Sequence, residues 1–308
     1  MLEETKEKKS WNEHEGELIG HVNGFDVIDC ANCSFKHIIP IPTAEALEVT
    51  YKDEYYSKEK PLYLDRAEED KDWWKLVNSE RYELFESFLD TPRRRILEIG
   101  SGPGFFLLEG KERGWETLGF EPSTKAAAHA SEMGLNIVND FLTEENSKEL
   151  GVFDVIYMHE VLEHLPEPQT FMRIVNSLLA PGGLVSVIVP NDYNPFQRVL
   201  NSTLDFAPWW VAPPHHINYF NNSSLSSLLE FAGIEVISSE TTFPIDIFLL
   251  MGENYVGNDK VGRECHERRK NFEMNLERAG LSALKRSIYE SFAKHGLGRE
   301  IVLLGRKT

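Results

Sequence analysis

Between residues 94 and 240, short apolar runs alternate with stretches in which apolar residues recur every three or four positions. The runs have the length of buried strands and the stretches have the length of surface helices. Including one later run, seven strands are predicted at residues 95–100, 117–121, 136–140, 153–158, 184–189, 234–238 and 300–304, with helices at 104–112, 123–132, 168–179 and 223–232. This alternation is typical of an α/β domain whose mostly parallel sheet is covered by helices on both faces.

The first 66 residues have a different pattern. Residues 1–13 are charged and lack periodicity, so we expect a flexible tail. In the segment 14–66, the runs Glu17–Val22 and Phe25–Cys30 flank Asn23-Gly24, a dipeptide typical of a type I′ turn. The sequence therefore predicts a small amino-terminal hairpin, followed by a connector punctuated by prolines.

Two further segments are predicted to be helical outside the alternating region. Apolar residues at helical spacing over 72–89 predict a helix that caps a ligand pocket or packs beneath the first strand. The family resemblance given below implies that residues 243–298 are an insertion before the last strand. It carries the apolar run Phe243–Met251 and a charged helical stretch, Arg263–Ala279. A lid, a substrate platform or a homodimer interface would each account for an exposed apolar run.

Charge and hydropathy exclude several classes of partner. The chain of 308 residues has a formal net charge of −18, and its longest basic cluster is Arg93-Arg94-Arg95, so we expect no nucleic-acid partner. No apolar run approaches the roughly 20 residues of a membrane span, and the amino terminus lacks the apolar core of a signal peptide. We therefore expect a cytoplasmic protein without a membrane partner. The three cysteines do not make a disulfide framework.

The turn after the first predicted strand carries the clearest chemical signal. A buried strand runs into a helix through Glu98, Gly100, Ser101, Gly102 and Gly104, and the glycines let a ligand approach the backbone. The amino end of the helix favours a carboxylate or a phosphate. A dinucleotide fingerprint needs a glycine at position 105, which is Phe105, so a nicotinamide enzyme is disfavoured. A purely structural glycine turn is the alternative.

The spacing of this turn resembles motif I of the class I S-adenosylmethionine (AdoMet) dependent methyltransferases. Later segments are similar to further motifs of that family: Glu121-Pro122 after the second strand, Asp140-Phe141 after the third, and His159 to His164 after the fourth. The resemblance implies that AdoMet contacts the turn residues and His159, with Glu121-Pro122 at the ribose and Asp140-Phe141 at the adenine. It also implies a Rossmann-like seven-stranded sheet with the last strand antiparallel, formed by a core at 67–242 and a final strand within 299–308.

The methyl acceptor is expected beyond the carboxyl ends of the fourth and fifth strands. The run 209–220 is rich in aromatic and histidine residues, which suits a sugar ring or another small polyol. It resembles the His-x-x-Tyr-Phe segment of methyltransferases of sugar and antibiotic pathways, with His216, Tyr219 and Phe220 at matching positions. In sugar C-methyltransferases a Tyr and a Glu accompany this histidine. Here those positions are Pro213 and His215, which favours O-methylation over C-methylation.

These observations lead to one main hypothesis for the reaction. We expect an AdoMet-dependent methyltransferase that acts on a small molecule, a sugar or nucleotide sugar of surface polysaccharide or secondary metabolism. His215 or His216 would be the base, with Tyr219 and His159 as further catalytic candidates. Alternatively, one of the two histidines caps the following helix and Tyr219 packs in the core. The other functional class is an AdoMet-binding partner or regulator without turnover.

Cys30 and Cys33 form a Cys-x-x-Cys pair at the end of the predicted hairpin. Such a pair is half of a zinc ribbon, and His14, His21 and His37 are near enough in sequence to supply nitrogen ligands. Sugar C-methyltransferases also carry an amino-terminal zinc-binding hairpin, but this chain lacks one of their two Cys-x-x-Cys pairs. The sequence therefore favours two ordinary thiols over a zinc site.

Overall fold

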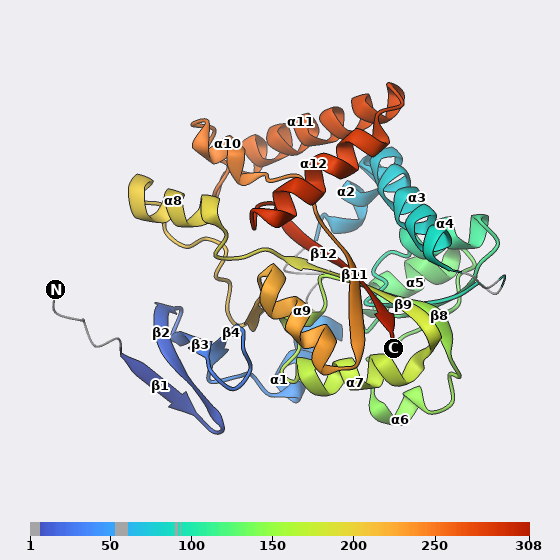
Figure 1. Ribbon diagram of the computed structural model, residues 1–308, viewed down its shortest axis with the longest axis horizontal. Coiled ribbons are helices and arrows are strands. Elements are labelled where there is room, and N and C mark those ends of the chain that lie inside the picture. The colour runs from blue at the N-terminus through green and yellow to red at the C-terminus, as the bar shows by residue number, and fades with distance from the viewer. Residues whose placement is uncertain (1–6, 53–60, 90–91, 93) are drawn as a thin grey trace.

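A seven-stranded sheet forms the centre of the molecule in the computed structural model, which describes residues 7–52, 61–89, 92 and 94–308. The strand order is β11-β12-β9-β8-β5-β6-β7 (Figure 1). The strands are β5 (Arg95–Ile99), β6 (Glu116–Phe120), β7 (Ile137–Val138), β8 (Phe153–His159), β9 (Leu179–Pro190), β11 (Ile234–Thr241) and β12 (Glu300–Lys307). Strand β12 pairs antiparallel with both of its neighbours, β9 and β11, and the other pairs in this sheet are parallel. This arrangement confirms the predicted sheet. The strand order reverses between β5 and β8, and α/β folds bind ligands at such a point.

A second, smaller sheet is built from the amino-terminal segment. Its order is β1-β2-β3-β4-β10, with β1 (Lys8–Trp11), β2 (His14–Val22), β3 (Phe25–Cys30), β4 (Lys36–Ile39) and β10 (Asn218–Tyr219). The predicted hairpin is confirmed as β2 and β3. Asn23 and Gly24 both have positive φ, 49° and 84°, as a type I′ turn requires. The expectation of an unstructured segment at 1–13 is wrong for Lys8–Trp11, which pairs with β2, while residues 1–6 lie outside the described part.

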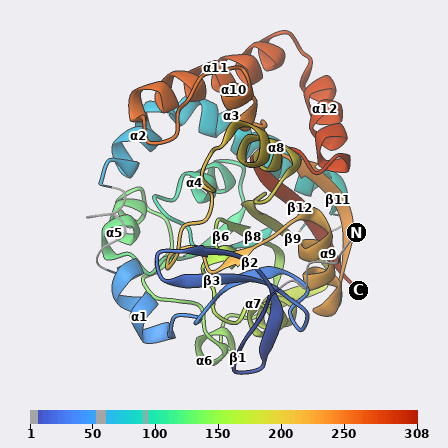
Figure 2. The same cartoon turned by 90° about the vertical axis from the view of Figure 1, so that its left-hand side faces the viewer.

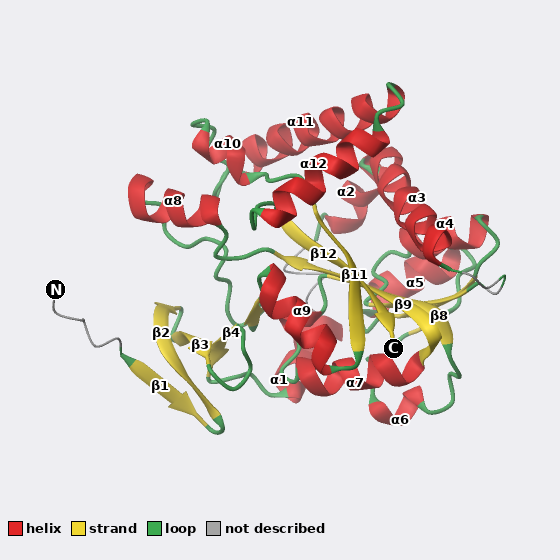
Figure 3. Cartoon of the chain, viewed as in Figure 1, coloured by secondary structure: helices red, strands yellow, loops and turns green. Residues whose placement is uncertain are grey.

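Helices cover both faces of the central sheet (Figure 3). They are α1 (Ala44–Val49), α2 (Tyr63–Glu69), α3 (Lys71–Phe88), α4 (Phe105–Glu112), α5 (Thr124–Glu132), α6 (Glu144–Ser147), α7 (Pro168–Leu178), α8 (Pro195–Leu204), α9 (Asn222–Phe231), α10 (Asp246–Leu250), α11 (Asp259–Arg278) and α12 (Ser282–Lys294). A 3₁₀ turn, Leu162–His164, follows β8. None of the helices in the described part of the chain is long and apolar enough to cross a membrane.

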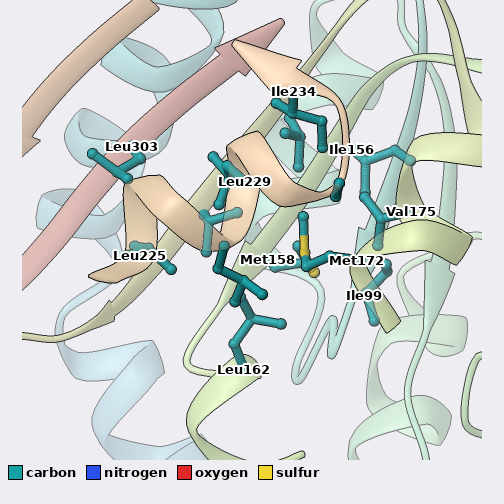
Figure 4. Close-up of a cluster of buried hydrophobic side chains, with 14 of the residues drawn as sticks. Ile99, Ile156, Met158, Leu162, Met172, Val175, Leu225, Leu229, Ile234 and Leu303 are labelled. Atoms are coloured by element: carbon teal, nitrogen blue, oxygen red, sulfur yellow. The ribbon is translucent and has the colours of Figure 1, made fainter. Parts of the chain in front are cut away.

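Alternating side chains of the strands pack on opposite faces of the sheet. On one face Ile99, Ile156 and Met158 meet residues of α7 and α9, such as Met172 and Leu229 (Figure 4). On the other face the neighbouring strand residues, among them Ile96, Val155 and Tyr157, pack against α3, α4 and α5. Because both faces are covered, the strands read in the sequence as continuous apolar runs.

The insertion before β12 folds onto the helices that precede the sheet. Helices α10, α11 and α12 lie along the top of Figure 1, next to α2 and α3, and the turned view in Figure 2 shows the same arrangement. The apolar run at its start is not an exposed patch: Phe248 and Leu249 are 8% and 2% exposed, and only Met251 is largely exposed, at 69%. Phe243 packs against Phe248 and Phe272. The run is therefore largely covered within the chain, which removes the reason for assigning it to a homodimer interface.

Candidate active site

A cavity of about 1060 Å³ lies at the carboxyl ends of β5, β6 and β8. This volume is at the upper end of the range for small-molecule sites, roughly 300–1,000 Å³, so two ligands can share it. Nine of the ten residues predicted to bind the cofactor line it: Glu98, Gly100, Ser101, Gly102, Glu121, Pro122, Asp140, Phe141 and His159. The structure thus brings together residues that are up to 61 positions apart between Glu98 and His159.

The glycine turn is shaped by three left-handed residues, with φ of 73° at Gly100, 50° at Gly102 and 86° at Gly104. Side chains rarely adopt this conformation, so glycine is needed at all three. Gly104, the tenth predicted cofactor residue, does not line the cavity. A Cβ atom there would come within 2.8 Å of Ala130 and 2.7 Å of Leu135. Gly104 therefore serves the close packing of α4 against α5 and the residues that follow it.

Two carboxylates lie beneath the turn. Glu121 follows β6 and accepts hydrogen bonds from the amides of Gly102 (2.7 Å) and Ser123 (2.8 Å), which fix its side chain. Burial raises the pKa of Glu121 to about 7 against the lowering effect of these amides. Burial and the neighbouring charge of Glu121 raise the pKa of Glu98 well above its usual range. A ligand with a cationic group would restore the charged form of Glu98.

Buried polar atoms at this turn test whether AdoMet fits. Glu98 Oε2 and Ser101 Oγ are buried, belong to residues that line the cavity, and have no hydrogen-bond partner among the described residues. Such atoms are costly unless a ligand or water satisfies them. The ammonium and carboxylate groups of the methionine part of AdoMet are a donor and an acceptor of the right kind. The residues present therefore fit this cofactor.

Asp140 and Phe141 lie farther out, where the cavity opens. The Asp140 side chain is 51% exposed and forms an ion pair with Lys52 at 3.5 Å. Lys52 Nζ also lies over the Phe141 ring, 5.9 Å from its centroid. Lys52 follows α1, so the amino-terminal segment contributes to this wall of the cavity, which the sequence did not predict.

His159, at the end of β8, forms a half-buried pair with Glu300, the first residue of β12. Nε2 of His159 lies 3.0 Å from Oε1 of Glu300. Burial acts to lower the pKa of His159, but the charge and hydrogen bond of Glu300, with the charge of Glu160, outweigh it and raise that pKa. Burial acts to raise the pKa of Glu300, but His159, Arg269 and Arg299 lower it to about 2. Glu300 therefore stays ionised and orients the imidazole.

The backbone beside this pair is unusual. Glu160 adopts φ of 53°, which is uncommon for a residue with a side chain. Such conformations occur most often at functional sites, where the surrounding structure holds them. His159, Glu160 and Glu300 place three possible ligand atoms within 4.8 Å of one another, as do Glu163, His164 and His216. Each group could hold a divalent cation.

Three of the predicted catalytic residues do not line the cavity: His215, His216 and Tyr219. Tyr219 is 2% exposed, packs in an apolar cluster with Ile38 and Ile217, and donates a hydrogen bond to the His216 carbonyl at 3.0 Å. The His216 ring lies 5.0 Å from the ring of His164, which lines the cavity, but His216 itself is not part of the lining. The aromatic run 209–220 thus serves mainly to pack the smaller sheet against the core.

His164 is hydrogen-bonded to two neighbouring segments. Its Nδ1 lies 2.8 Å from the carbonyl of His215 and 2.8 Å from the hydroxyl of Tyr51. These contacts tie the turn after β8 to the run 209–220 and to the amino-terminal segment.

The wall opposite the glycine turn comes from α3 and the insertion, and most of it was not predicted. Trp73, Trp74, Glu80 and Arg81 contribute from α3, as the predicted capping role of this helix implies, and His266, Arg269, Glu273, Lys285 and Tyr289 contribute from α11 and α12. Lys285 is 5% exposed and pairs with Glu80 at 2.7 Å. Tyr289 donates to Glu273 at 2.7 Å. The sequence predicted a charged helical stretch at Arg263–Ala279, but it did not predict α12 or indicate which helix these segments meet.

The strand order, the acid-and-glycine turn at the point where that order reverses, and the acidic residues after β6 and β7 define an AdoMet-binding methyltransferase fold of class I. Comparison with known proteins agrees. A family profile described as "Methyltransferase domain" matches residues 68–239, more than half of the chain. The chain belongs to this family, and its methyl donor is AdoMet.

Curated relatives match over a shorter segment. The ubiquinone biosynthesis O-methyltransferases of Escherichia fergusonii and Escherichia coli are 37% and 36% identical to the chain over 97 residues. These residues are 29% of this chain and 40% of each relative, so less than half of either protein is compared.

Solved structures are similar at low identity. A SAM dependent methyltransferase from Archaeoglobus fulgidus is 17% identical with a TM-score of 0.49, over 75% of this chain and 93% of that one. The plantazolicin methyltransferase in complex with SAH is 12% identical with a TM-score of 0.49, over 85% of this chain and 94% of that one.

Proposed function

We propose that the chain transfers the methyl group of AdoMet to a hydroxyl oxygen of a small ring compound, and that this acceptor is a sugar or nucleotide sugar. The observation that carries the proposal is the His159–Glu300 pair on the wall of the cofactor cavity. A hydroxyl must lose its proton when it is methylated, and a histidine oriented by a carboxylate is suited to take it. The curated relatives are named as O-methyltransferases, which agrees with oxygen as the acceptor atom.

The residues around the turn are assigned to the cofactor. Glu98 would accept from its ammonium group and Ser101 would donate to its carboxylate, since both residues line the cavity and each has a buried polar atom without a partner among the described residues. Glu121 would accept from the ribose hydroxyls, with Pro122 beside it, and Asp140 with Phe141 would hold the adenine. AdoMet supplies a methyl group on a positively charged sulfur, and the remaining task of the protein is to align the acceptor and exclude water.

The chemistry assigned to His159 follows from its hydrogen bond. Because Nε2 donates to Glu300, Nδ1 is the nitrogen that can take a proton. Nδ1 would take the hydroxyl proton as the acceptor oxygen gains the methyl group, and the ionised Glu300 would stabilise the imidazolium that forms. The ring of Trp74 lies 6.1 Å from that of His159, so an aromatic face adjoins the base.

A sugar acceptor is supported by the composition of the opposite wall. The rings of Trp73 and Trp74 provide apolar faces, while Glu80, Glu273 and Lys285 provide donors and acceptors around them. A polyhydroxylated ring uses both kinds of contact, because carboxylates that already accept one hydrogen bond, as Glu80 does from Lys285 and Glu273 does from Tyr289, can accept another.

The test is methyl transfer from labelled AdoMet to a panel of nucleotide sugars, free sugars and phenols. We expect label in a nucleotide sugar or sugar, with mass spectrometry and NMR placing the new methyl group on oxygen. His159→Asn should lower turnover by about 10²-fold, the usual contribution of a positioned base, without changing the AdoMet affinity measured by calorimetry.

Four outcomes would contradict parts of this proposal. Transfer only to phenols would remove the sugar acceptor, and a methyl group on carbon would remove O-methylation. If His216→Asn abolished turnover while His159→Asn did not, the base would be the histidine first suggested by the sequence. Tight AdoMet binding without transfer to any acceptor would favour a non-catalytic AdoMet-binding protein.

A further inference from the structure

Four metal-binding side chains converge in the smaller sheet, well apart from the cofactor cavity. They are His14 at the start of β2, Cys30 at the end of β3, Cys33 in the following turn and His37 on β4. One ligand atom from each lies within 4.8 Å of the other three. Nδ1 of His14 is 3.3 Å from Sγ of Cys33 and 3.8 Å from Sγ of Cys30. Ligands around one tetrahedral Zn²⁺ have separations of this order, given bond lengths of about 2.0–2.3 Å.

The backbone explains why these residues meet. The pairing of β2 with β3 places Gly16 opposite Cys30, and that of β3 with β4 places Ile28 opposite His37. Between β3 and β4 the chain makes a tight turn in which the Ser34 amide donates to the Cys30 carbonyl at 3.0 Å. Ser34 has φ of 64°, a conformation that folds Cys33 back towards Cys30. The turn thus brings both thiols to the same side.

His37 is arranged as metal-bound histidines usually are. Its Nδ1 lies 3.0 Å from the carbonyl of Ile38, and because a carbonyl only accepts, Nδ1 carries the hydrogen. In the neutral ring Nε2 then has no hydrogen and carries a lone pair that can bind a metal ion. This atom is buried, belongs to a side chain that is 1% exposed, and has no hydrogen-bond partner in the described part of the chain. A bond from the outer nitrogen to a carbonyl is the contact that fixes the ring of a metal ligand.

We propose that His14, Cys30, Cys33 and His37 hold one structural Zn²⁺ with Nδ1, two thiolates and Nε2 as its four ligands. Two thiolates and two imidazoles complete a closed tetrahedral site, with no open position for catalysis. Two ordinary thiols, the interpretation that the sequence favoured, would leave the buried Nε2 of His37 unexplained. His21 was also a candidate ligand, but its Nδ1 lies 2.8 Å from Asp26 Oδ1 and it stands outside the cluster.

The position of this site gives it a role in shaping the enzyme. His37 is paired with Asn218 in the ladder of β4 with β10, and the Ile38 amide donates to the Ile217 carbonyl at 3.0 Å. The Asn218 side chain in turn donates to the carbonyls of Leu162 (2.9 Å) and Leu165 (2.7 Å). Leu165 and the adjacent His164 line the cofactor cavity. The zinc site therefore clamps residues 217–220, and through them the turn that forms one edge of the cavity.

The first experiment measures the metal directly. Protein purified without chelators should contain about one zinc per chain by mass spectrometry of the metal. Apo protein titrated with Co²⁺ should develop the visible bands of a tetrahedral site and a thiolate charge-transfer band. Cys33→Ser should lose most of the zinc, whereas Cys33→His, which replaces one ligand by another, should retain it.

Matched controls separate the site from general thiol or histidine binding. Cys265→Ser removes the third cysteine, which is buried in α11, and His21→Ala removes a histidine of the same hairpin. Both should keep the full zinc content. The site would be wrong if the wild type bound neither Zn²⁺ nor Co²⁺, if Cys33→Ser kept its zinc, or if protein kept reduced throughout carried a Cys30–Cys33 disulfide.

The second experiment tests the clamp. Chelation of the zinc should raise amide hydrogen exchange in residues 217–220 and in the turn 162–165, with exchange in β5 and β6 unchanged. AdoMet affinity should stay within about twofold, because none of its proposed contacts belongs to residues 162–165 or 217–220. Zinc loss with unchanged exchange at 217–220 would overturn the clamp. Zinc content and hydrogen exchange are measured without a methyl acceptor, so their results are independent of whether the proposed reaction is correct.

Discussion

At the scale of single residues, the His159–Glu300 pair shows how distant positions set one another's chemistry. The two residues are 141 positions apart, and they meet because β8 and β12 both border β9. Each would be costly to bury alone as a charge, but together they keep the carboxylate ionised and raise the pKa of the imidazole.

This coupling predicts a shift in the pH profile. The proposed base must be neutral to act, so wild-type turnover should rise with pH through the raised pKa of His159. In Glu300→Gln the main raising influence is gone, and burial should then lower that pKa. The midpoint of the turnover profile, measured from pH 5 to 9, should move to lower pH in the variant. Glu235→Gln, an exposed change on β11, is the control, and an unmoved midpoint in Glu300→Gln would contradict the assignment.

The cofactor residues were accessible from sequence because they are short-range signals at strand ends. Glu98, Gly100 and Glu121 each follow or end a run that could only be a buried strand. The packing role of Gly104 was not accessible, since Ala130 and Leu135 come from a later helix and loop. Lys285 and Tyr289 were missed for the same reason: their place in the cavity depends on how the insertion folds back on α3.

At the scale of elements, most strands and helices of the alternating region were predicted, whereas α8, α12 and the two-residue strand β10 were not. Strand β8 and helix α9 lie within one or two residues of their predicted bounds. Strand β10 has two residues, Asn218 and Tyr219, and its conformation depends on pairing with β4. No local sequence pattern predicts such a short strand, because its extended conformation depends on tertiary contacts.

The packing of α3 on α4 predicts opposite effects for two helical glycines. Gly110 lies in α4 against the fully buried Tyr82, whose hydroxyl would be 2.2 Å from an added Cβ. Gly110→Ala should therefore destabilise the protein by about 1–3 kcal/mol. Gly262 lies in α11, and an added Cβ there meets nothing within 4 Å, so Gly262→Ala should stabilise by roughly 0.5–1 kcal/mol. Urea unfolding measures the free-energy change of both variants. Equal effects would show that α3 moves aside to make room for the added methyl group on Gly110.

At the scale of the whole molecule, segments nearly 200 residues apart are joined by a buried ion cluster. Asp70, between α2 and α3, is 5% exposed and contacts Arg263 (2.8 Å), His266 (2.9 Å) and Lys270 (2.5 Å) of α11. Burial acts to raise the pKa of Asp70, but these three partners hold it well below its usual 3.8. The cluster attaches the insertion to the helices that form the other part of the same cavity wall.

Removing this carboxylate should loosen the insertion. Asp70→Asn removes the buried carboxylate that Arg263, His266 and Lys270 share, leaving Arg263 and Lys270 only their partners Glu69 and Glu267, and we expect a loss of about 3 kcal/mol in the free energy of unfolding at pH 7. The stability that Asp70 provides is present above its unfolded pKa and is lost as pH falls below about 3.8, so the difference between wild type and variant should shrink there. Asp72→Asn, an exposed change in the first turn of α3, should be neutral. A difference that is independent of pH would contradict this account.

The position of β12 has a consequence for synthesis. This strand lies inside the sheet, hydrogen-bonded to β9 on one side and to β11 on the other, although it is formed by residues 300–307. A ribosome must therefore release these residues before β9 and β11 lose their open edges. Until then both strands expose unpaired amides and carbonyls, a template for wrong pairing. The growing chain thus passes through a stage in which correct folding depends on chaperones or on rapid completion of the sheet. A message truncated shortly before residue 300 would yield an aggregation-prone product.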